Sequence, residues 1–578
     1  MPNISATPSA FSRHPKVLIF PDVMAILLVL SFIMLLGTAG HQMLGPFTPE
    51  RPAQISLSPA MLPMYTLRTV ARMMAALAAS LIFTFIYATW AAKSRRAEMI
   101  LIPLLDALQS VPVLGYLSFT VVFFLALFPG SQLGPELAAI FAIFTSQAWN
   151  MAFSFYQSLR TVPTDLDEAS RSFPETAWQR FWKLEVPFAM PGLIWNTMMS
   201  MSGGWFFVVA SEAIAVGSTQ VALPGVGSYV ATAIEQHDLA AVMWAIVAMS
   251  IAIVVCDQLL FRPLVAWADK FRCEQTVSQA APRSWVFELM SRSPVLQWSA
   301  APVRRGFSRV ARARFMLPHG VRVTRRWRLP TWIMDLVWYG LIAVGVAAVA
   351  AQIGRYIRPV LTWADLRIVL SNGGLTFLRV VVLVAVASII WVPAGVAIGL
   401  RPRLTQRIQP IAQFLAAFPA NLLFPLAVYL IVHFSLAPKI WLSPLMILGT
   451  QWYILFNVIA GASAIPSDFR EAAASFRVRP WHWWSRVMLP GIFPYFVTGA
   501  ITASGGAWNA SIVAEAVSWG PIHLSASGLG AYIAEQTAAG DYPRIALGIA
   551  VMSVMVILMN RLLWRPMYAF AERRTRLD

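Results

Sequence analysis

The chain has 578 residues, of which 58% are hydrophobic and only 12% are charged. Soluble domains carry roughly a quarter charged residues, so this composition excludes an ordinary soluble protein and indicates one embedded in a lipid bilayer. The formal net charge of +18 does not indicate nucleic acid binding, because the cations stand beside apolar segments, where positive charge marks cytoplasmic loops.

Six apolar segments in the first half are long enough to cross a bilayer. They lie near residues 17–38, 65–92, 99–128, 136–158, 189–216 and 240–262. The first follows Arg13 and Lys16 and has the outline of a signal peptide. It is too long for a signal core, however, and no A-x-A-like cleavage site follows it. We therefore expect it to be the first membrane-spanning helix.

The chain loses its long apolar runs between about residues 271 and 330 and becomes rich in arginine. The arginines are Arg304, Arg305, Arg309, Arg312, Arg314, Arg322, Arg325, Arg326 and Arg328. Because positive charge beside membrane segments marks the cytoplasmic side, we expect a cytoplasmic linker. Two interpretations are open: a solvated connector, which we favour, and a regulatory element that binds the anionic lipids of the cytoplasmic leaflet.

A second set of six apolar segments follows the linker. They lie near residues 332–352, 375–400, 408–433, 439–462, 491–517 and 543–564. Cations such as Lys93, Arg401 and Arg574 follow several crossings and place those loops and both termini in the cytoplasm. The sequence thus predicts an all-α, multi-pass protein of the bacterial inner membrane with about 12 transmembrane helices. Its expected parts are a six-helix repeat at 1–270, the linker at 271–330 and a second six-helix repeat at 331–578.

The two halves repeat one another at a fixed spacing. Residues 162–173, VPTDLDEASRSF, correspond to 465–476, IPSDFREAAASF, and the same offset of 303 pairs Trp149 with Trp452. Nearer the start of each half the offset is 307. Because each copy has an even number of crossings, both enter the membrane in the same direction. A two-fold axis along the membrane normal can therefore relate them.

Each half carries a polar segment between its fourth and fifth crossings that is longer than an ordinary helix connection. Pro163 with Asp165, and Pro466 with Asp468, indicate the start of a helix in each segment. These residues resemble the EAA loop of ABC importer permeases, in which Glu-Ala-Ala is followed by Gly and then by Pro. The matching residues are Asp165, Glu168, Ala169, Ser170 and Pro187 in the first copy and Asp468, Glu471, Ala472, Ala473 and Pro490 in the second.

The resemblance implies that each loop forms a short coupling helix that docks onto an ATPase subunit. It implies two such subunits, a periplasmic or extracellular substrate-binding protein and a small-molecule solute as partners. Ser170 replaces the second Ala of the family pattern, and Pro174 and Arg477 replace its Gly. Arginine neither permits a sharp bend as glycine does nor breaks a helix as proline does. The turn geometry of the second loop is therefore an open question.

The resemblance covers nearly all of both halves and is nearest to the nitrate, sulfonate and taurine branch of these permeases. It rests on Thr69 and Arg72, repeated as Thr376 and Arg379, on proline-interrupted third helices and on a Glu followed by Gly-x-Gly after the fifth helix. It implies a small anion, such as nitrate, a sulfonate or a related oxyanion, as the solute. Gly-Lys occurs nowhere, so the chain has no P-loop and ATP hydrolysis falls to the separate subunits. The sequence predicts no catalytic site, no metal and no cofactor.

Two groups of residues near the fifth helices are further candidates. A candidate translocation path comprises Gly203, Gly204, Trp205, Gly505, Gly506, Trp508 and Asn509. Glycine permits close helix packing, so a packing seam without solute contact fits these residues equally well. Arg72 with Glu212, and Arg379 with Glu515, are predicted structural ion pairs, because an unpaired charge at membrane depth is costly.

A secondary transporter driven by an ion gradient is the alternative class for a duplicated membrane protein without catalytic residues. Its paired loops would be ordinary amphipathic connectors. Glu-Ala-Ala is common in helices, but two copies in register on the predicted cytoplasmic side favour the importer. The two classes are distinguishable, because a secondary transporter works in vesicles without ATP or partner proteins.

Overall fold

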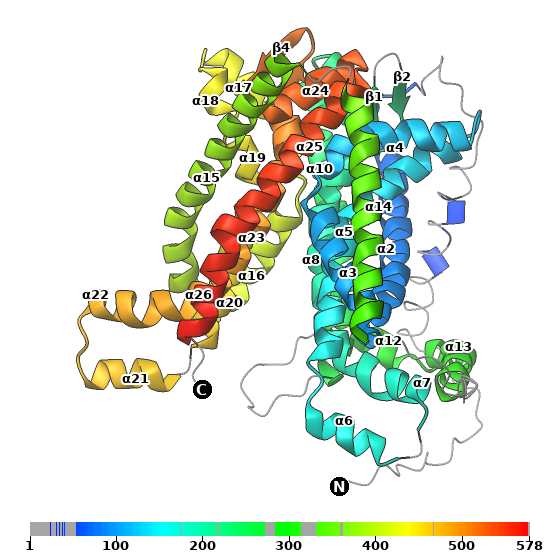
Figure 1. Ribbon diagram of the computed structural model, residues 1–578, viewed down its shortest axis with the longest axis vertical. Coiled ribbons are helices and arrows are strands. Elements are labelled where there is room, and N and C mark those ends of the chain that lie inside the picture. Colours follow the sequence, from blue (N-terminus) through cyan, green and yellow to red (C-terminus); the bar gives the residue numbers. More distant parts are fainter. Residues whose placement is uncertain are drawn as a thin grey trace.

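Long helices stand side by side in two bundles, one built mostly from each half of the chain (Figure 1). This computed structural model describes residues 54–173, 175–216, 219–271, 284–313, 331–358, 362–465 and 467–575, with isolated positions between 24 and 40. Short helices protrude at one end of the bundles, which we call the loop end (Figure 1). Two β-hairpins lie at the opposite end, which we call the hairpin end.

The first half contains ten helices and one hairpin among its described residues. They are α2 (Leu62–Lys93), α3 (Arg95–Ser110), α4 (Val113–Leu127), α5 (Leu133–Arg160), α6 (Thr164–Arg171), α7 (Ala177–Arg180), α8 (Val186–Glu212), β1 (Ala213–Val216), β2 (Thr219–Ala222), α9 (Val226–Glu235), α10 (Leu239–Cys256) and α11 (Arg262–Ala268). The connector forms α12 (Trp285–Arg292) and α13 (Pro294–Arg312).

The second half repeats this order. Its elements are α14 (Thr331–Ile357), α15 (Trp363–Gly399), α16 (Pro402–Ala417), α17 (Phe424–His433), α18 (Pro438–Trp441), α19 (Leu445–Leu448), α20 (Trp452–Ala464), α21 (Ser467–Ser475), α22 (Pro480–Trp483), α23 (Leu489–Ala514), β3 (Ala516–Trp519), β4 (Ile522–Ser525), α24 (Leu529–Ala539), α25 (Tyr542–Met559) and α26 (Arg565–Thr575). Short 3-10 turns are η1 (Pro59–Met61), η4 (Asp269–Phe271) and η6 (Ala420–Leu423). Single π-helical turns are η2 (Phe181–Glu185), η3 (Asp257–Phe261), η7 (Trp484–Met488) and η8 (Asn560–Trp564).

The duplication extends to irregularities within the helices. The π turn η2 precedes α8, and η7 precedes α23 at the same offset of 303 that relates the loop sequences. The π turns η3 and η8 keep this offset as well. Since π turns are rare, their repetition shows that the two halves share one backbone design and not only a set of apolar segments.

Three of the expected crossings are broken, and two of them are the third segments, in which the sequence indicated proline interruptions. The helices α3 and α4 meet at 98°, α16 and the segment η6–α17 at 78°, and α18–α19 and α20 at 45°. Proline explains the first two breaks, because Pro112 and Pro419 force the preceding residue into an extended conformation. The third break falls at Gly449, Thr450 and Gln451.

The expected count of 12 crossings stays a prediction. Within the described residues, seven helices are long and apolar enough to cross a membrane, or ten if each bent pair is one crossing. The helix α8 is not among the seven, because polar residues such as Asn196, Ser200 and Ser202 interrupt its apolar sequence. The predicted crossing at 17–38 lies outside the described residues apart from isolated positions.

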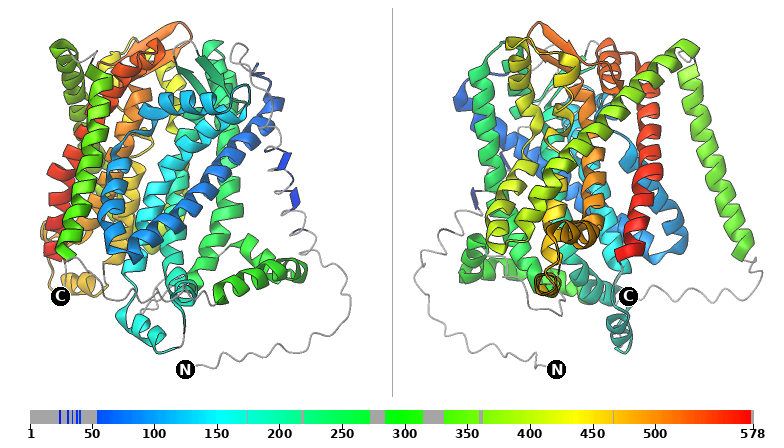
Figure 2. Two further views of the ribbon diagram at one scale, coloured as in Figure 1. Left: turned by 45° about the vertical axis from the view of Figure 1, so that its right-hand side comes forward. Right: turned by 90° about the vertical axis from the view of Figure 1, so that its left-hand side faces the viewer.

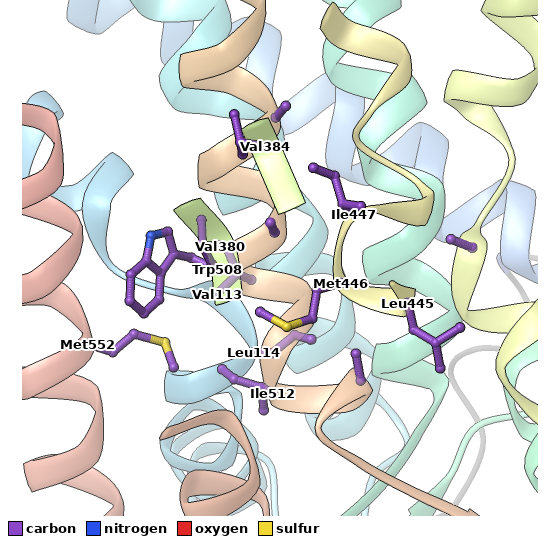
Figure 3. Close-up of a cluster of buried hydrophobic side chains, with 14 of the residues drawn as sticks. Val113, Leu114, Val380, Val384, Leu445, Met446, Ile447, Trp508, Ile512 and Met552 are labelled. Carbon is purple, nitrogen blue, oxygen red and sulfur yellow. The ribbon is translucent and has the colours of Figure 1, made fainter. Parts of the chain in front are cut away.

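Each half contributes buried residues to the hydrophobic core of the other half. Val113 and Leu114 of α4 pack among Trp508, Ile512 and other buried residues of the second half (Figure 3). In return, residues of α16, η6, α17 and β3 join the core of the first half; they are Ala417, Leu422, Val428 and Trp519. Each bent third segment therefore stabilises the other repeat, as expected if a two-fold axis relates the halves.

Close packing inside the second bundle depends on Gly499 of α23. A Cβ atom on Gly499 would lie 2.8 Å from the Tyr453 carbonyl oxygen and 3.0 Å from the Ile454 Cα atom of α20. A Cβ atom on Gly505, one and a half turns later, would meet nothing within 4 Å. Both glycines lie inside one helix, so replacement by alanine gives each the same gain in helix propensity, about 1 kcal/mol.

We expect Gly499→Ala to lower the thermal midpoint of the detergent-solubilised protein, because backbone atoms of α20 have to move away. Overpacking of this kind costs about 1–3 kcal/mol. Gly505→Ala is the matched control, and its midpoint should equal or exceed that of the parent. Equal midpoints for the two variants would contradict the packing described here.

Candidate functional site

The first protruding loop consists of α6 and α7. Pro163 precedes α6, and Asp165 and Asp167 lie in its first turn, where negative charge is favourable. Asp165, Glu168 and Ala169 are exposed to solvent. Ser170 is half-buried and donates a hydrogen bond of 2.8 Å from its Oγ to the Asp167 carbonyl oxygen. The acidic residues of the motif are thus available to a partner at the loop end.

The second loop consists of α21 and α22. Glu471 and Ala472 are exposed and Ala473 is half-buried, whereas the side chain of Asp468 lies outside the described residues. Two aromatic side chains are strongly exposed here, Phe476 at 82% and Trp481 at 72%. Strongly exposed aromatic side chains are typical of a surface that a partner covers.

The second loop turns at Arg477, which occupies the position of the family's glycine. Arg477 has φ of 47°, the left-handed conformation that glycine adopts freely and other residues adopt at a cost. The backbone thus keeps the glycine-like turn while the side chain is arginine. Pro174, at the equivalent position of the first loop, lies outside the described residues.

Each loop leads directly into a long helix. Pro187 and Pro490 are the second residues of α8 and α23, directly after the π turns η2 and η7. The segments α7–η2–α8 and α22–η7–α23 follow one another without an intervening loop. A displacement of either loop is therefore transmitted along the helix that follows it.

A cavity of about 1070 Å³ lies between the two halves. Gly203 of α8 and Gly505, Gly506 and Asn509 of α23 are among its lining residues. The lining also includes uncharged polar and aromatic groups that the sequence analysis did not single out: Trp149, Asn150, Trp195, Asn196, Thr450, Tyr453 and Asn457. Asparagine within an otherwise apolar helix was a signal that could have found several of these. Among the lining residues there is no charged side chain.

The structure places three candidate path residues away from this cavity. A Cβ atom on Gly204 would face Gln147 and Met73 of neighbouring helices, and Trp205 is buried in the core of the first half. Trp508 is buried in the core of the second half, where its Nε1 donates to the Met559 Sδ at 3.4 Å. Helix geometry explains the division, since neighbouring positions point in directions about 100° apart.

Two hydrogen bonds join the halves beside the cavity. The Val113 amide of α4 donates to the Asn509 Oδ1 of α23 over 2.7 Å. The Asn421 Nδ2 of η6 donates to the Phe206 carbonyl oxygen of α8 over 3.2 Å. In both cases the break in a third segment meets the fifth helix of the other half. The helices that line the cavity are therefore tied across the seam.

A buried ion pair lies near the hairpin end of each half. In the first half Arg72 donates from Nη1 to the Glu212 Oε1 over 2.6 Å and makes two further hydrogen bonds, of 2.5 and 2.7 Å, to Glu136 of α5. All three side chains are at most 1% exposed. Sequence reasoning missed Glu136, because the repeat places Lys439 at the corresponding position.

The pair in the second half is simpler. Arg379 donates from Nη1 to the Glu515 Oε1 over 2.8 Å, and 16% of the Arg379 side chain is exposed. Arg72 thus binds two carboxylates in the first half, whereas Arg379 binds Glu515 in the second. The two sites differ in the carboxylates that each arginine binds, although their sequence motifs agree.

Each glutamate also binds the start of the next helix. Glu212 accepts the Gly227 amide over 2.7 Å, and Glu515 accepts the Gly530 amide over 2.8 Å. A Cβ atom on Gly225 would overlap the Glu212 carboxylate, and one on Gly227 would overlap the Val209 carbonyl oxygen. The Gly-x-Gly sequence is therefore required because the carboxylate approaches the backbone closely.

Two segments of the chain match one known family. Residues 82–266 and 391–576 each match the family described as binding-protein-dependent transport system inner membrane component. The two matches together cover more than half of the chain. The chain belongs to this family of importer permeases. The ABC importer permease inferred from the paired loops is confirmed, and so is its duplicated form.

Curated relatives of the permease differ in what their names say they transport. The bicarbonate transport system permease protein CmpB of Synechocystis is 28% identical over 178 residues, which are 31% of this chain and 60% of that protein. The nitrate import permease protein NrtB of Leptolyngbya laminosa is 26% identical over 184 residues, 32% of this chain and 62% of that protein. The glycine betaine/proline betaine transport system permease protein ProW of Escherichia coli is 32% identical over 160 residues, which are 28% of this chain and 43% of that protein. The match thus spans less than two thirds of each relative.

Replacement of Arg72 should destabilise the folded permease more than replacement of Arg379. Arg72→Gln removes the cation that both Glu212 and Glu136 bind, whereas Arg379→Gln removes the cation that Glu515 binds, and a broken buried pair costs about 3–5 kcal/mol. We expect a lower yield and a lower thermal midpoint for Arg72→Gln. Adding Glu212→Gln to Arg72→Gln should recover part of the loss, and a further loss on adding it would contradict the pairing.

Arg477→Gly should stabilise the folded conformation of the second loop by about 1 kcal/mol or less, because glycine adopts the left-handed conformation without strain. Hydrogen exchange of the α21 and α22 amides measures the effect, which should appear as slower exchange. Arg477→Ala removes the same side chain but keeps the strain, so its exchange should match the parent. Slower exchange in the alanine variant would show that the side chain, not the backbone, is responsible.

Proposed function

We propose that this permease is the transmembrane subunit of an ATP-driven, binding-protein-dependent ABC importer. Two ATPase subunits dock on α6 and α21 from the cytoplasm, and a substrate-binding protein delivers the solute at the hairpin end. The single observation that carries this proposal is the pair of matched, exposed loops that lead without interruption into the cavity-lining helices α8 and α23. The permease hydrolyses no ATP itself.

The orientation in the bacterial inner membrane follows from the same loops. They face the cytoplasm, and both termini lie on that side. Residues 1–270 and 331–578 are the two permease repeats, and 271–330 is the cytoplasmic linker. One chain therefore supplies both halves of the pathway, and the active complex contains one permease for two ATPase subunits.

Transport proceeds by alternating access at the seam between the halves. The cavity lining reaches Pro402, the first residue of α16, and Ala464, the last residue of α20, three residues before α21 begins. The arrangement described here is thus hollow toward the loop end. When ATP brings the two ATPase subunits together, α6 and α21 approach one another, and α8 and α23 carry this movement to the hairpin end.

A small anion, such as nitrate, a sulfonate or a related oxyanion, is the solute we propose. The cavity offers amide and hydroxyl groups from both halves and no charged side chain. Such groups donate hydrogen bonds to an oxyanion without the tight ion pairing that would slow its release. Glu212 and Glu515 do not oppose this solute, because each is bound to an arginine and to backbone amides away from the lining.

Proteoliposomes that contain the permease, its ATPase and its binding protein test the proposal. Uptake of nitrate, sulfonates, bicarbonate and glycine betaine should be compared with and without internal ATP. We expect ATP-dependent uptake of an oxyanion and none without the ATPase. Uptake by the permease alone, driven by an ion gradient, would instead establish a secondary transporter.

The loops can be tested by charge reversal. Glu168→Arg combined with Glu471→Arg should abolish co-purification of the ATPase and most ATP-dependent uptake, because it places a cation where each loop exposes an acid. The thermal midpoint should stay that of the parent. Glu288→Arg on α12 reverses another exposed acid at the same end, which forms an ion pair with Arg292 one turn away, and should leave ATPase binding intact. Unchanged uptake in the double variant would exclude these loops as the docking sites.

A further inference from the structure

The connector between the halves is folded at the loop end. The helices α12 and α13 lie crosswise to the spanning helices at the level where those helices end, and α13 extends outward from the bundle (Figure 2). Among the described helices, α13 packs on α12 and α7. Most of the described side chains of α13 are exposed.

The helix α13 is amphipathic. Four arginines, Arg304, Arg305, Arg309 and Arg312, fall on one side when successive residues are rotated by about 100°. Phe307 and Val310 fall on the other side and are 54% and 52% exposed. The helix contains no acidic residue. One side of α13 thus carries four positive charges with no acid on the same helix, and the other carries exposed apolar groups.

We propose that α12 and α13 form a membrane-surface element that binds the anionic glycerophospholipids of the bilayer around the permease. The chain spans a bilayer, so the lipid surface passes at the level of these helices. A cationic amphipathic helix buries its apolar side at the boundary between headgroups and acyl chains and keeps its cations near the phosphates. Each arginine close to an anionic surface contributes about 1 kcal/mol.

Exposed tryptophans support this choice of partner. Trp298 of α13 is 79% exposed and Trp285 of α12 is 56% exposed. Tryptophan is costly to leave in water but is favourable at the level of lipid headgroups, where one edge of the indole ring is apolar and the other donates a hydrogen bond. Charge, apolar exposure and aromatic content therefore point to one occupant, an anionic lipid surface.

The helix α13 contacts α7 of the first loop, whereas the counterpart residue in the second loop is exposed. The Trp178 Nε1 and the Gln179 Nε2 of α7 donate to carbonyl oxygens of α13 over 2.7 and 2.8 Å, and the Trp182 ring lies edge-on against Phe307 at 5.0 Å. In the second half Trp481, the counterpart of Trp178, is 72% exposed. Lipid bound to α13 thus restrains the first loop alone.

Spin labels can locate α13 relative to the bilayer. In a background with Cys256→Ser and Cys273→Ser, the full chain would carry a label at Val310→Cys or at Ser308→Cys, two positions about 200° apart around the helix. Nanodiscs of phosphatidylcholine would be compared with nanodiscs that also contain phosphatidylglycerol. We expect the Val310 label to become more accessible to oxygen and less accessible to a water-soluble nickel chelate when phosphatidylglycerol is present. The Ser308 label should stay more accessible to the chelate in both.

A charge series separates lipid binding from folding. Changing Arg304, Arg305, Arg309 and Arg312 to Gln should abolish the effect of phosphatidylglycerol on the Val310 label, whereas changing the same four to Lys should preserve it, because a lipid phosphate accepts either cation. Equal water accessibility of both labels in both bilayers would overturn the proposal. Shielding of the Val310 label only after the ATPase is added would also overturn it, since the helix would then be a protein-docking surface. None of these measurements depends on transport.

Discussion

The buried contact between an arginine, a glutamate and the start of the following helix is the constraint on which the hairpin end depends. In the first half Glu212 gathers Arg72 and Thr69 of α2 and the Gly227 amide of α9 around one carboxylate. Three separate segments are thereby fixed at one point. A charge at this depth is tolerable only when it is paired and hydrogen-bonded. The loss of any partner therefore leaves a buried charge without compensation, which destabilises the folded state. The second half builds the same junction around Glu515.

The two halves share their backbone but differ in their chemistry, and the differences fall at both ends of the molecule. Glu136 adds a second carboxylate to the ion pair of the first half, where the second half has Lys439. At the loop end α13 packs on α7, whereas Trp481 beside α22 stands exposed. The exchange of cores between the halves keeps these unlike parts in one rigid frame, because each bent third segment is held by the opposite repeat. Symmetry of fold therefore coexists with unequal loops and unequal ion pairs.

Much of this arrangement could be predicted from the repeat, because two copies at a fixed offset show which polar residues recur. The loops, and the arginine and glutamate that meet in each half, were accessible in this way. Glu136 could not be found in this way, because the corresponding residue of the second copy is Lys439 and the comparison of the two copies therefore shows no shared acid. The proline interruptions of the third segments were visible in the sequence, but the angles of the bends were not. The division between Gly203, which lines the cavity, and Gly204, which does not, depends on how α8 is rotated in the packed bundle.

Joining the two repeats in one chain changes what evolution can do with them. In a dimer of identical subunits every substitution occurs twice, so a change that suits one docking partner or one side of the pore is imposed on both. A covalently linked pair accepts the substitution once and leaves the twin site untouched. The solitary extra acid of the first repeat and the arginine in the left-handed turn of the second are such one-sided changes. Linkage of the two repeats in one chain thus permits the two sides to differ at single residues while both keep the same fold.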